Sequence, residues 1–215
     1  MKRNLIALFV SAALLAAAPA TVLAQPQAAS AASTVSPSKL VLDNSTRILT
    51  TLEERRDEFR ADRGALRTFI ASEFDNMFDR TYAARLVLGR HGRGASDAEV
   101  GKFADALANS LMARYGSSLL DFNSQLKVRV KSETPLRGGA MVKVSSEFLR
   151  EGGEPVPVDY LLRRNGNDWK VFDVMVEGVS FVQTFRNQFD GPLSRQSIAE
   201  VAAQLETGKL KAGTD

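Results

Sequence analysis

The spacing of hydrophobic side chains changes twice along this chain, and the two changes limit the folds open to it. From residue 37 to about 116 these side chains recur every three or four positions, as on one face of a helix. From about 126 to 176 they alternate with polar side chains, as in a strand with one buried face, and from about 181 to 205 the helical spacing returns. Helices, then a sheet, then helices predict an α+β fold with segregated elements.

The first helical block contains a broad apolar stripe and a separate capped helix. Ser96 and Glu99 are three residues apart and form a capping box, so a helix is expected to begin there and to end near Gly116. Its apolar face consists of Val100, Phe103, Leu107, Leu111 and Tyr115. The stripe that precedes it consists of Leu66, Phe69, Ile70, Phe74, Met77 and Phe78.

The alternating block predicts four strands joined by short turns. Glycines at 152, 153 and 166 mark two of the turns, and such short connections favour an antiparallel meander. The expected strands cover residues 126–131, 142–148, 156–162 and 169–176.

The N-terminal residues have the pattern of a secretory signal peptide. Basic Lys2 and Arg3 precede an apolar stretch and the small-residue cleavage site that ends at Ala24. We expect residues 1–24 to be removed, residues 25–36 to form a disordered leader, and residues 208–215 to form a flexible tail. After removal, 26 Lys and Arg side chains remain against 25 Asp and Glu, a balance that does not indicate a nucleic-acid-binding protein.

The residue types exclude several kinds of chemistry. With no cysteine and one histidine, the chain has no thiolate metal site, disulfide scaffold or cysteine nucleophile. No phosphate-binding, G-x-S-x-G or H-E-x-x-H motif is present, so we expect no enzymatic activity and no metal or cofactor. The glycine-rich run Gly89–Gly94, which contains His91, is expected to be a surface loop, with contact to a lipid headgroup as the alternative.

Three segments resemble the MlaC family, the periplasmic phospholipid shuttles also called toluene-tolerance auxiliary proteins. The segment Phe172–Ser180 resembles the family's acidic-Gly-Val-Ser step from a last strand into a helix. Leu86–Gly89, followed by the capped helix, is similar to a second family stretch, and Trp169 fits a third. The tyrosine-rich loop that follows the second stretch in the family is here Arg90–Arg93, which leaves the role of this loop undecided.

The resemblance implies a fold and a function. It implies a twisted four-stranded antiparallel sheet, similar to nuclear transport factor 2, packed with a helical subdomain around an apolar lipid cavity. This domain would cover residues 37–207, with 37–121 mainly helical, 122–177 forming the sheet and 178–207 helical. A soluble, monomeric periplasmic carrier is then expected. Phospholipid would be its cargo, exchanged with an outer-membrane lipoprotein complex and with the lipid-binding subunit of an inner-membrane ABC transporter to maintain outer-membrane lipid asymmetry.

Fifteen residues are predicted to line the lipid site. The resemblance points to the strand-to-helix step, and its positions here are Val179, Ser180, Val182 and Gln183. Hydrophobic spacing adds a second set, for which ordinary core packing is the competing interpretation. This second set consists of Phe74, Met77, Phe78, Tyr82, Leu86, Leu107, Leu111, Tyr115, Val174, Val176 and Phe185.

Other functions stay open at the level of sequence. The cargo could be a hopanoid or another apolar lipid, or the core could be solid, as in a periplasmic adaptor. An isomerase-type enzyme of the same fold would need Asp159, Asp173 or Tyr160 in the cavity, although alternation places Asp159 opposite the apolar face. Four basic residues on the polar side of the first two strands would suit an acidic partner or a solvated face. They are Lys127, Arg129, Lys131 and Lys143.

Overall fold

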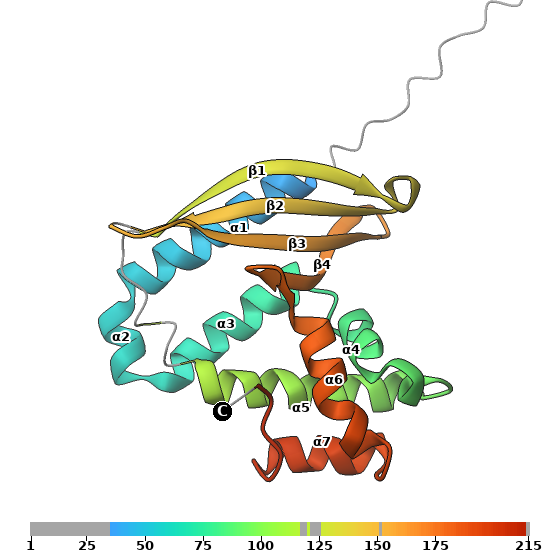
Figure 1. Cartoon of the computed structure of the whole chain (residues 1–215). Coiled ribbons are helices and arrows are strands. Elements are labelled where there is room, and N and C mark those ends of the chain that lie inside the picture. The colour runs from blue at the N-terminus through green and yellow to red at the C-terminus, as the bar shows by residue number, and fades with distance from the viewer. Residues whose placement is uncertain (1–34, 117–119, 121–125, 151, 214–215) are drawn as a thin grey trace, which may run out of the picture. The chain divides into compact units, whose positions relative to one another are not determined.

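The structure is a computed structural model that describes residues 35–116, 120, 126–150 and 152–213 (Figure 1). The expected signal peptide and most of the expected leader lie outside these residues. The helices are α1 (Pro37–Glu54), α2 (Arg56–Ala61), α3 (Arg63–Met77), α4 (Arg80–Leu88), α5 (Asp97–Tyr115), α6 (Phe181–Leu193) and α7 (Ile198–Glu206), with 3₁₀ turns η1 (Gly89–Gly92) and η3 (Arg137–Gly139). The strands are β1 (Lys127–Leu136), β2 (Met141–Leu149), β3 (Val156–Asn165), β4 (Asp168–Val176) and β5 (Val179–Ser180).

The helices begin where the local sequence supplies a cap. Ser36 caps α1 through its side chain, which accepts a hydrogen bond from the Lys39 amide, and Pro37 occupies the first helical position, where no amide donor is needed. The predicted capping box of Ser96 and Glu99 is present at the start of α5, with Gly116 as its C-cap. A second capping box, in which Ser197 pairs with Glu200, begins α7.

The strands form one antiparallel sheet in the order β1-β2-β3-β4-β5, so the predicted meander is confirmed and the predicted count of four is wrong. The additional strand is only Val179–Ser180. It forms because Glu177 and Gly178 both adopt positive φ, 50° and 82°, as the tight turn of a two-residue hairpin requires.

Cross-strand register defines two faces of the sheet. The inner face carries apolar rows such as Val144, Tyr160 and Val174, which α1 and the end of α3 cover with Val41 and Met77. The outer face carries charged side chains such as Lys143 and Asp159. A bulge between Leu161 and Leu162 places Phe172 out of alternation, so Val171 and Val174 share a face although they are three residues apart.

The hydrophobic core has three parts. One joins the inner face of the sheet to α1 and α3, and a small one lies among α1, α2 and α3 around Phe59. The third joins α4, α5, α6 and α7, and its centre is an edge-to-face contact between Phe103 and Phe189, both fully buried. None of the helices in the described ranges combines the length and hydropathy of a membrane-spanning segment.

The segment after α7 differs from the prediction of a flexible tail. Ala212 is fully buried, its amide bonds to Ser110 Oγ, and the Gln188 side chain exchanges hydrogen bonds with the backbone of Gly213. Ala212 and Gly213 are small enough for the chain to lie close to α5 and α6. Their hydrogen bonds hold residues 208–213 against these helices. Residues 214–215 lie outside the described part.

Candidate functional site

The inner face of the sheet continues as a partly exposed apolar surface at the end of β4. Val174 and Val176 pack on the sheet core but are only half-buried, and the register places Val176 opposite Val179, whose exposed fraction is 58%. Phe78 packs against the same core. The ring of Phe74 stacks on the ring of Phe78, with centroids 4.5 Å apart. We refer to these five residues as the inner apolar surface. Solvated apolar side chains that gather in this way indicate a binding surface.

Helix α6 begins beside this surface and adds an aromatic residue to its margin. Phe181 is the first residue of α6, is 48% exposed, and lies two positions after Val179. Its ring centroid is 6.3 Å from that of Phe185, which is buried in the helical core. Phe181 was not among the predicted site residues. Its spacing of four from Phe185 was visible in the sequence, but this spacing is equally typical of a core residue.

Several predicted lining residues are buried in the core in this structure. Met77 is buried in the sheet core, and Leu107 and Phe185 are buried in the helical core. Leu111 and Val182 are partly buried and pack against the helical core. For these five, core packing accounts for the observed contacts, because a side chain enclosed by helices presents little area to a ligand.

The remaining predicted residues have varied surroundings. Ser180 and Gln183 make polar contacts in α6: the Ser180 hydroxyl caps the helix, and the Gln183 side chain bonds to Asn187. Tyr82 lies under the Arg163 guanidinium and edge-on to Phe172, and Leu86 is half-buried. Tyr115 is 42% exposed at the end of α5, where it contacts Gly213.

The corner from β4 through β5 into α6 is fixed by a buried carboxylate. Asp173 is 7% exposed; its Oδ2 accepts from the Ser180 hydroxyl at 2.6 Å, and its Oδ1 accepts from the Val182 amide at 3.0 Å. The Ser180 hydroxyl oxygen in turn accepts from the Gln183 amide at 3.0 Å. Two free amides in the first turn of α6 thereby obtain acceptors.

Two of the three residues that an enzyme would need do not face the inner surface. Asp159 pairs with Lys143 on the outer face, at 3.7 Å, and both oxygens of Asp173 serve the α6 corner. Tyr160 does face inward, with its hydroxyl 3.4 Å from Ser45 Oγ, and burial raises the pKa of its phenol. The described part of the chain contains no cluster of His, Asp and Glu side chains that could hold a metal ion.

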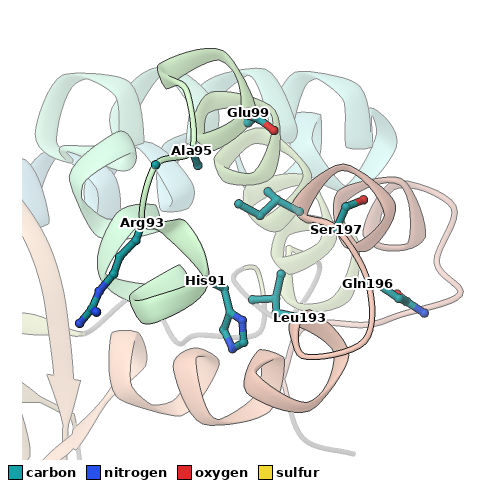
Figure 2. A pocket seen from close by; sticks show the side chains of 9 residues that line it. His91, Arg93, Ala95, Glu99, Leu193, Gln196 and Ser197 are labelled. Atoms are coloured by element: carbon teal, nitrogen blue, oxygen red, sulfur yellow. The ribbon is translucent and has the colours of Figure 1, made fainter.

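A pocket of about 320 Å³ lies elsewhere, where the first turns of α5 and α7 meet η1 (Figure 2). None of the fifteen predicted residues lines it. Its walls include His91, Arg93, Glu99 and Gln196, whose polar groups suit water or a small polar solute better than an acyl chain. The inner apolar surface is therefore the stronger candidate for an apolar ligand, because its exposed groups are aromatic and aliphatic.

The run Gly89–Gly94 is a short 3₁₀ turn attached to α6. Arg90 and His91 both bond to the Asp190 carboxylate, each at 2.9 Å, and the hydrogen bond from His91 and the charge of Arg90 lower the pKa of Asp190. The run therefore lies at the surface and is joined to α6 by these contacts. The sequence could not show the contact, because Asp190 lies about 100 residues further along the chain.

The basic residues of the first two strands are largely paired within the outer face. Arg129 and Lys131 both bond to Glu147 at 2.6 Å, and Lys143 pairs with Asp159. These ion pairs are typical of a solvated, mixed-charge sheet face, and they offset part of its positive charge.

Comparisons with known proteins agree on one family. The model of the family described as MlaC protein matches residues 42–207. The intermembrane phospholipid transport system binding protein MlaC of Haemophilus influenzae is 22% identical over 174 residues, which cover 80% of this chain and 81% of that protein. The toluene tolerance protein ttg2D of Pseudomonas putida is 25% identical over 162 residues, 74% of each chain.

A solved structure has the same fold. It is the phospholipid-binding protein of Ralstonia solanacearum in complex with a phospholipid, which superimposes with a TM-score of 0.70 at 21% identity and covers 79% of this chain and 94% of its own.

Proposed function

Because the chain belongs to the MlaC family, we propose that it is a carrier protein that binds a phospholipid and moves it between the outer and inner membranes. The family predicted from Phe172–Ser180 is thereby confirmed. The carrier would act in the periplasm after residues 1–24 are removed, and its direction of transport would be set by the membrane complexes with which it exchanges cargo. The observation that supports this most directly is the partly exposed inner apolar surface beside the β5–α6 corner.

The physical need for such a carrier is large. The two chains of a phospholipid contain on the order of 30 CH₂ groups, and at about 0.8 kcal/mol each their exposure to water costs roughly 20–25 kcal/mol. A carrier that covers the chains with apolar side chains removes most of this barrier. Because the lipid is then nearly as stable on the protein as in a bilayer, direction must come from the partner complexes.

The acyl chains would contact the inner apolar surface, with Val179 at its exposed edge. Phe74 and Phe78 supply flat aromatic area, and Val174 and Val176 continue it along β4. The headgroup would remain near solvent, since burial of a phosphate without partners costs several kcal/mol and would slow release. We therefore expect low selectivity among headgroups.

The carrier would have no catalytic step. Of the carboxylates that an enzyme of this fold would use, Asp159 pairs with Lys143 and Asp173 caps α6. Transfer of an intact lipid also breaks no covalent bond. The docking partners would be an outer-membrane lipoprotein complex and the lipid-binding subunit of an inner-membrane transporter.

Native mass spectrometry with organic extraction tests the proposal. The processed protein is purified from periplasm without detergent, and we expect a mass excess of about one phospholipid that extracts as glycerophospholipid. A protein that is free of lipid and takes up none from vesicles of phosphatidylethanolamine and phosphatidylglycerol would overturn the proposal. An extracted hopanoid would overturn the choice of cargo and keep the carrier.

A further inference from the structure

The first turn of α6 takes one of its caps from another element. Most helices here are capped by a side chain adjacent in sequence, as Ser96 caps α5. In α6 the adjacent Ser180 caps the Gln183 amide, while Asp173, from the middle of β4, caps the Val182 amide and also accepts from the Ser180 hydroxyl. We call Asp173 and Ser180 the corner clasp. A carboxylate that accepts amide hydrogens at a helix N-terminus is favoured by charge-assisted hydrogen bonding and by the helix dipole.

The corner clasp lies behind the residues that border the inner apolar surface. Ser180 pairs with Met175 and faces the outer side with Asp173, whereas Val179 pairs with Val176 and faces the inner side. Strand β5 is therefore bonded to Asp173 on the outer side of the sheet, while its Val179 side chain lies on the inner side. Phe181 follows immediately as the first residue of α6.

The rest of α6 is anchored to the helical core and not to the sheet. Phe185, Phe189 and Leu193 are buried among α4, α5 and α7. At its far end, Asp190 is held by Arg90 and His91 of η1. The corner clasp is thus a polar connection between α6, which packs in the helical core, and β4, which packs in the sheet core. A change in the clasp would alter the separation of α6 from the inner apolar surface without unpacking either core.

We propose that Asp173 is a positioning residue for lipid exchange: by holding the first turn of α6 on β4, it fixes Val179 and Phe181 at the edge of the inner apolar surface and so limits the rate at which a lipid enters or leaves. This inference rests on the proposed function. It assigns no chemistry to the carboxylate, since both oxygens already have donors.

The test compares Asp173→Asn with a matched control, Asp159→Asn. Both carboxylates are on the outer face of the sheet, but Asp159 pairs with Lys143, away from the corner. Each protein is loaded with a fluorescent phosphatidylethanolamine, and its transfer to vesicles of phosphatidylethanolamine and phosphatidylglycerol is followed in time. We expect Asp173→Asn to transfer about tenfold faster, equivalent to about 1.4 kcal/mol, and Asp159→Asn to stay within about twofold of the unmodified protein.

Amide hydrogen exchange supplies a readout that needs no lipid. In Asp173→Asn the Val182 amide should exchange faster, while amides in the middle of α5 should not change. Faster amide exchange with an unchanged transfer rate would overturn the inference, because the clasp would then be structural only. If the unmodified protein takes up no phospholipid, the proposed function fails instead, and the two failures are therefore distinguishable.

A milder variant keeps the inference testable if Asp173→Asn does not fold. Ser180→Ala removes the acceptor for the Gln183 amide but leaves Asp173 to cap the Val182 amide. We expect about threefold faster transfer from this variant, between the unmodified protein and Asp173→Asn. A transfer rate equal to that of the unmodified protein, in a folded Ser180→Ala protein, would also overturn the inference.

Discussion

Arg47 of α1 and Glu73 of α3 form a two-pronged ion pair: the Arg47 Nε donates to Glu73 Oε1 at 3.2 Å, and the Arg47 Nη2 donates to Glu73 Oε2. The Glu73 side chain is only 10% exposed, whereas that of Arg47 is 46% exposed. This pair connects the two helices that cover the inner face of the sheet. It therefore helps to fix α3, the helix that carries Phe74.

Replacement of Glu73 by Gln should weaken this connection. The neutral amide cannot accept from both guanidinium nitrogens, and a buried partner loses a charge-assisted hydrogen bond. Because Arg47 is nearly half-exposed, we expect a loss of only about 1 kcal/mol in the free energy of unfolding, measured by urea denaturation. The control is Glu54→Gln, at an exposed position, which should lose under about 0.5 kcal/mol in the free energy of unfolding. Equal losses in the two variants would contradict a role for the pair.

Replacement of Val179 by Glu should abolish lipid occupancy and leave the fold intact. The side chain is 58% exposed in the hairpin, so a carboxylate there is solvated in the empty protein. Among acyl chains the same charge would cost several kcal/mol. Native mass spectrometry and circular dichroism measure the two effects. Leu42→Glu, at an exposed apolar residue of α1, is the control and should retain its lipid. A folded Val179→Glu protein with normal lipid content would show that the lipid binds elsewhere.

Replacement of Phe103 by Ala should destabilise the helical half strongly. Phe103 is fully buried and packs edge-to-face on Phe189, with centroids 5.6 Å apart. Removal of the ring leaves a cavity and should reduce the free energy of unfolding by about 3–5 kcal/mol, measured by urea denaturation. Phe181→Ala, where the ring is 48% exposed, should lose under about 1 kcal/mol. Similar losses in both variants would mean that the Phe103 contact is not a packing centre.

The contact of Asp190 with His91 and Arg90 should make the stability of the protein depend on pH on the acid side. The hydrogen bond from His91, aided by Arg90, lowers the pKa of Asp190 in the folded state. A carboxyl whose folded pKa is lowered stabilises the fold above its unfolded pKa of about 4, and this contribution is lost as the pH falls below that value.

The prediction for Asp190→Asn follows from this loss of stability at low pH. Thermal melts should show a slightly lower Tm than the unmodified protein at pH 6, because the carboxylate is exposed and the effect is small. The difference should shrink as the pH falls below about 4, toward the lowered pKa of the folded protein. Asp57→Asn, at a side chain that is 99% exposed, should show no such convergence. A difference in Tm that grows as the pH falls would contradict the assignment.

Local features of the fold could be predicted from the sequence because they depend on neighbours within a few residues. The box of Ser96 and Glu99 begins a helix wherever that helix lies, and the alternation of Val142 and Val144 with polar residues gives the strand one buried face. The turn at Glu177 and Gly178 needed the structure, since a glutamate in the left-handed region is uncommon. The short strand that follows it was missed for this reason.

The residues predicted to line the lipid site occupy different surroundings in the structure. Phe78, Val174 and Val176 pack against the sheet core, Phe74 stacks on Phe78, and Val179 pairs with Val176, whereas Met77, Leu107 and Phe185 are buried in the core. Hydrophobic spacing predicts that a side chain is buried, but it does not show whether protein or ligand covers that side chain. Phe181 was missed because it has the same spacing as the buried Phe185.

The order of the helices and the four main strands, most helix caps and the family follow from residue types and spacing within short stretches of chain. Three features depend instead on the folded arrangement: Asp173 caps a helix, His91 bonds to Asp190, and Val179 stays exposed beside the apolar face of the sheet. These contacts join residues that are brought together by packing and strand register. Their partners are fixed only when the whole chain has folded.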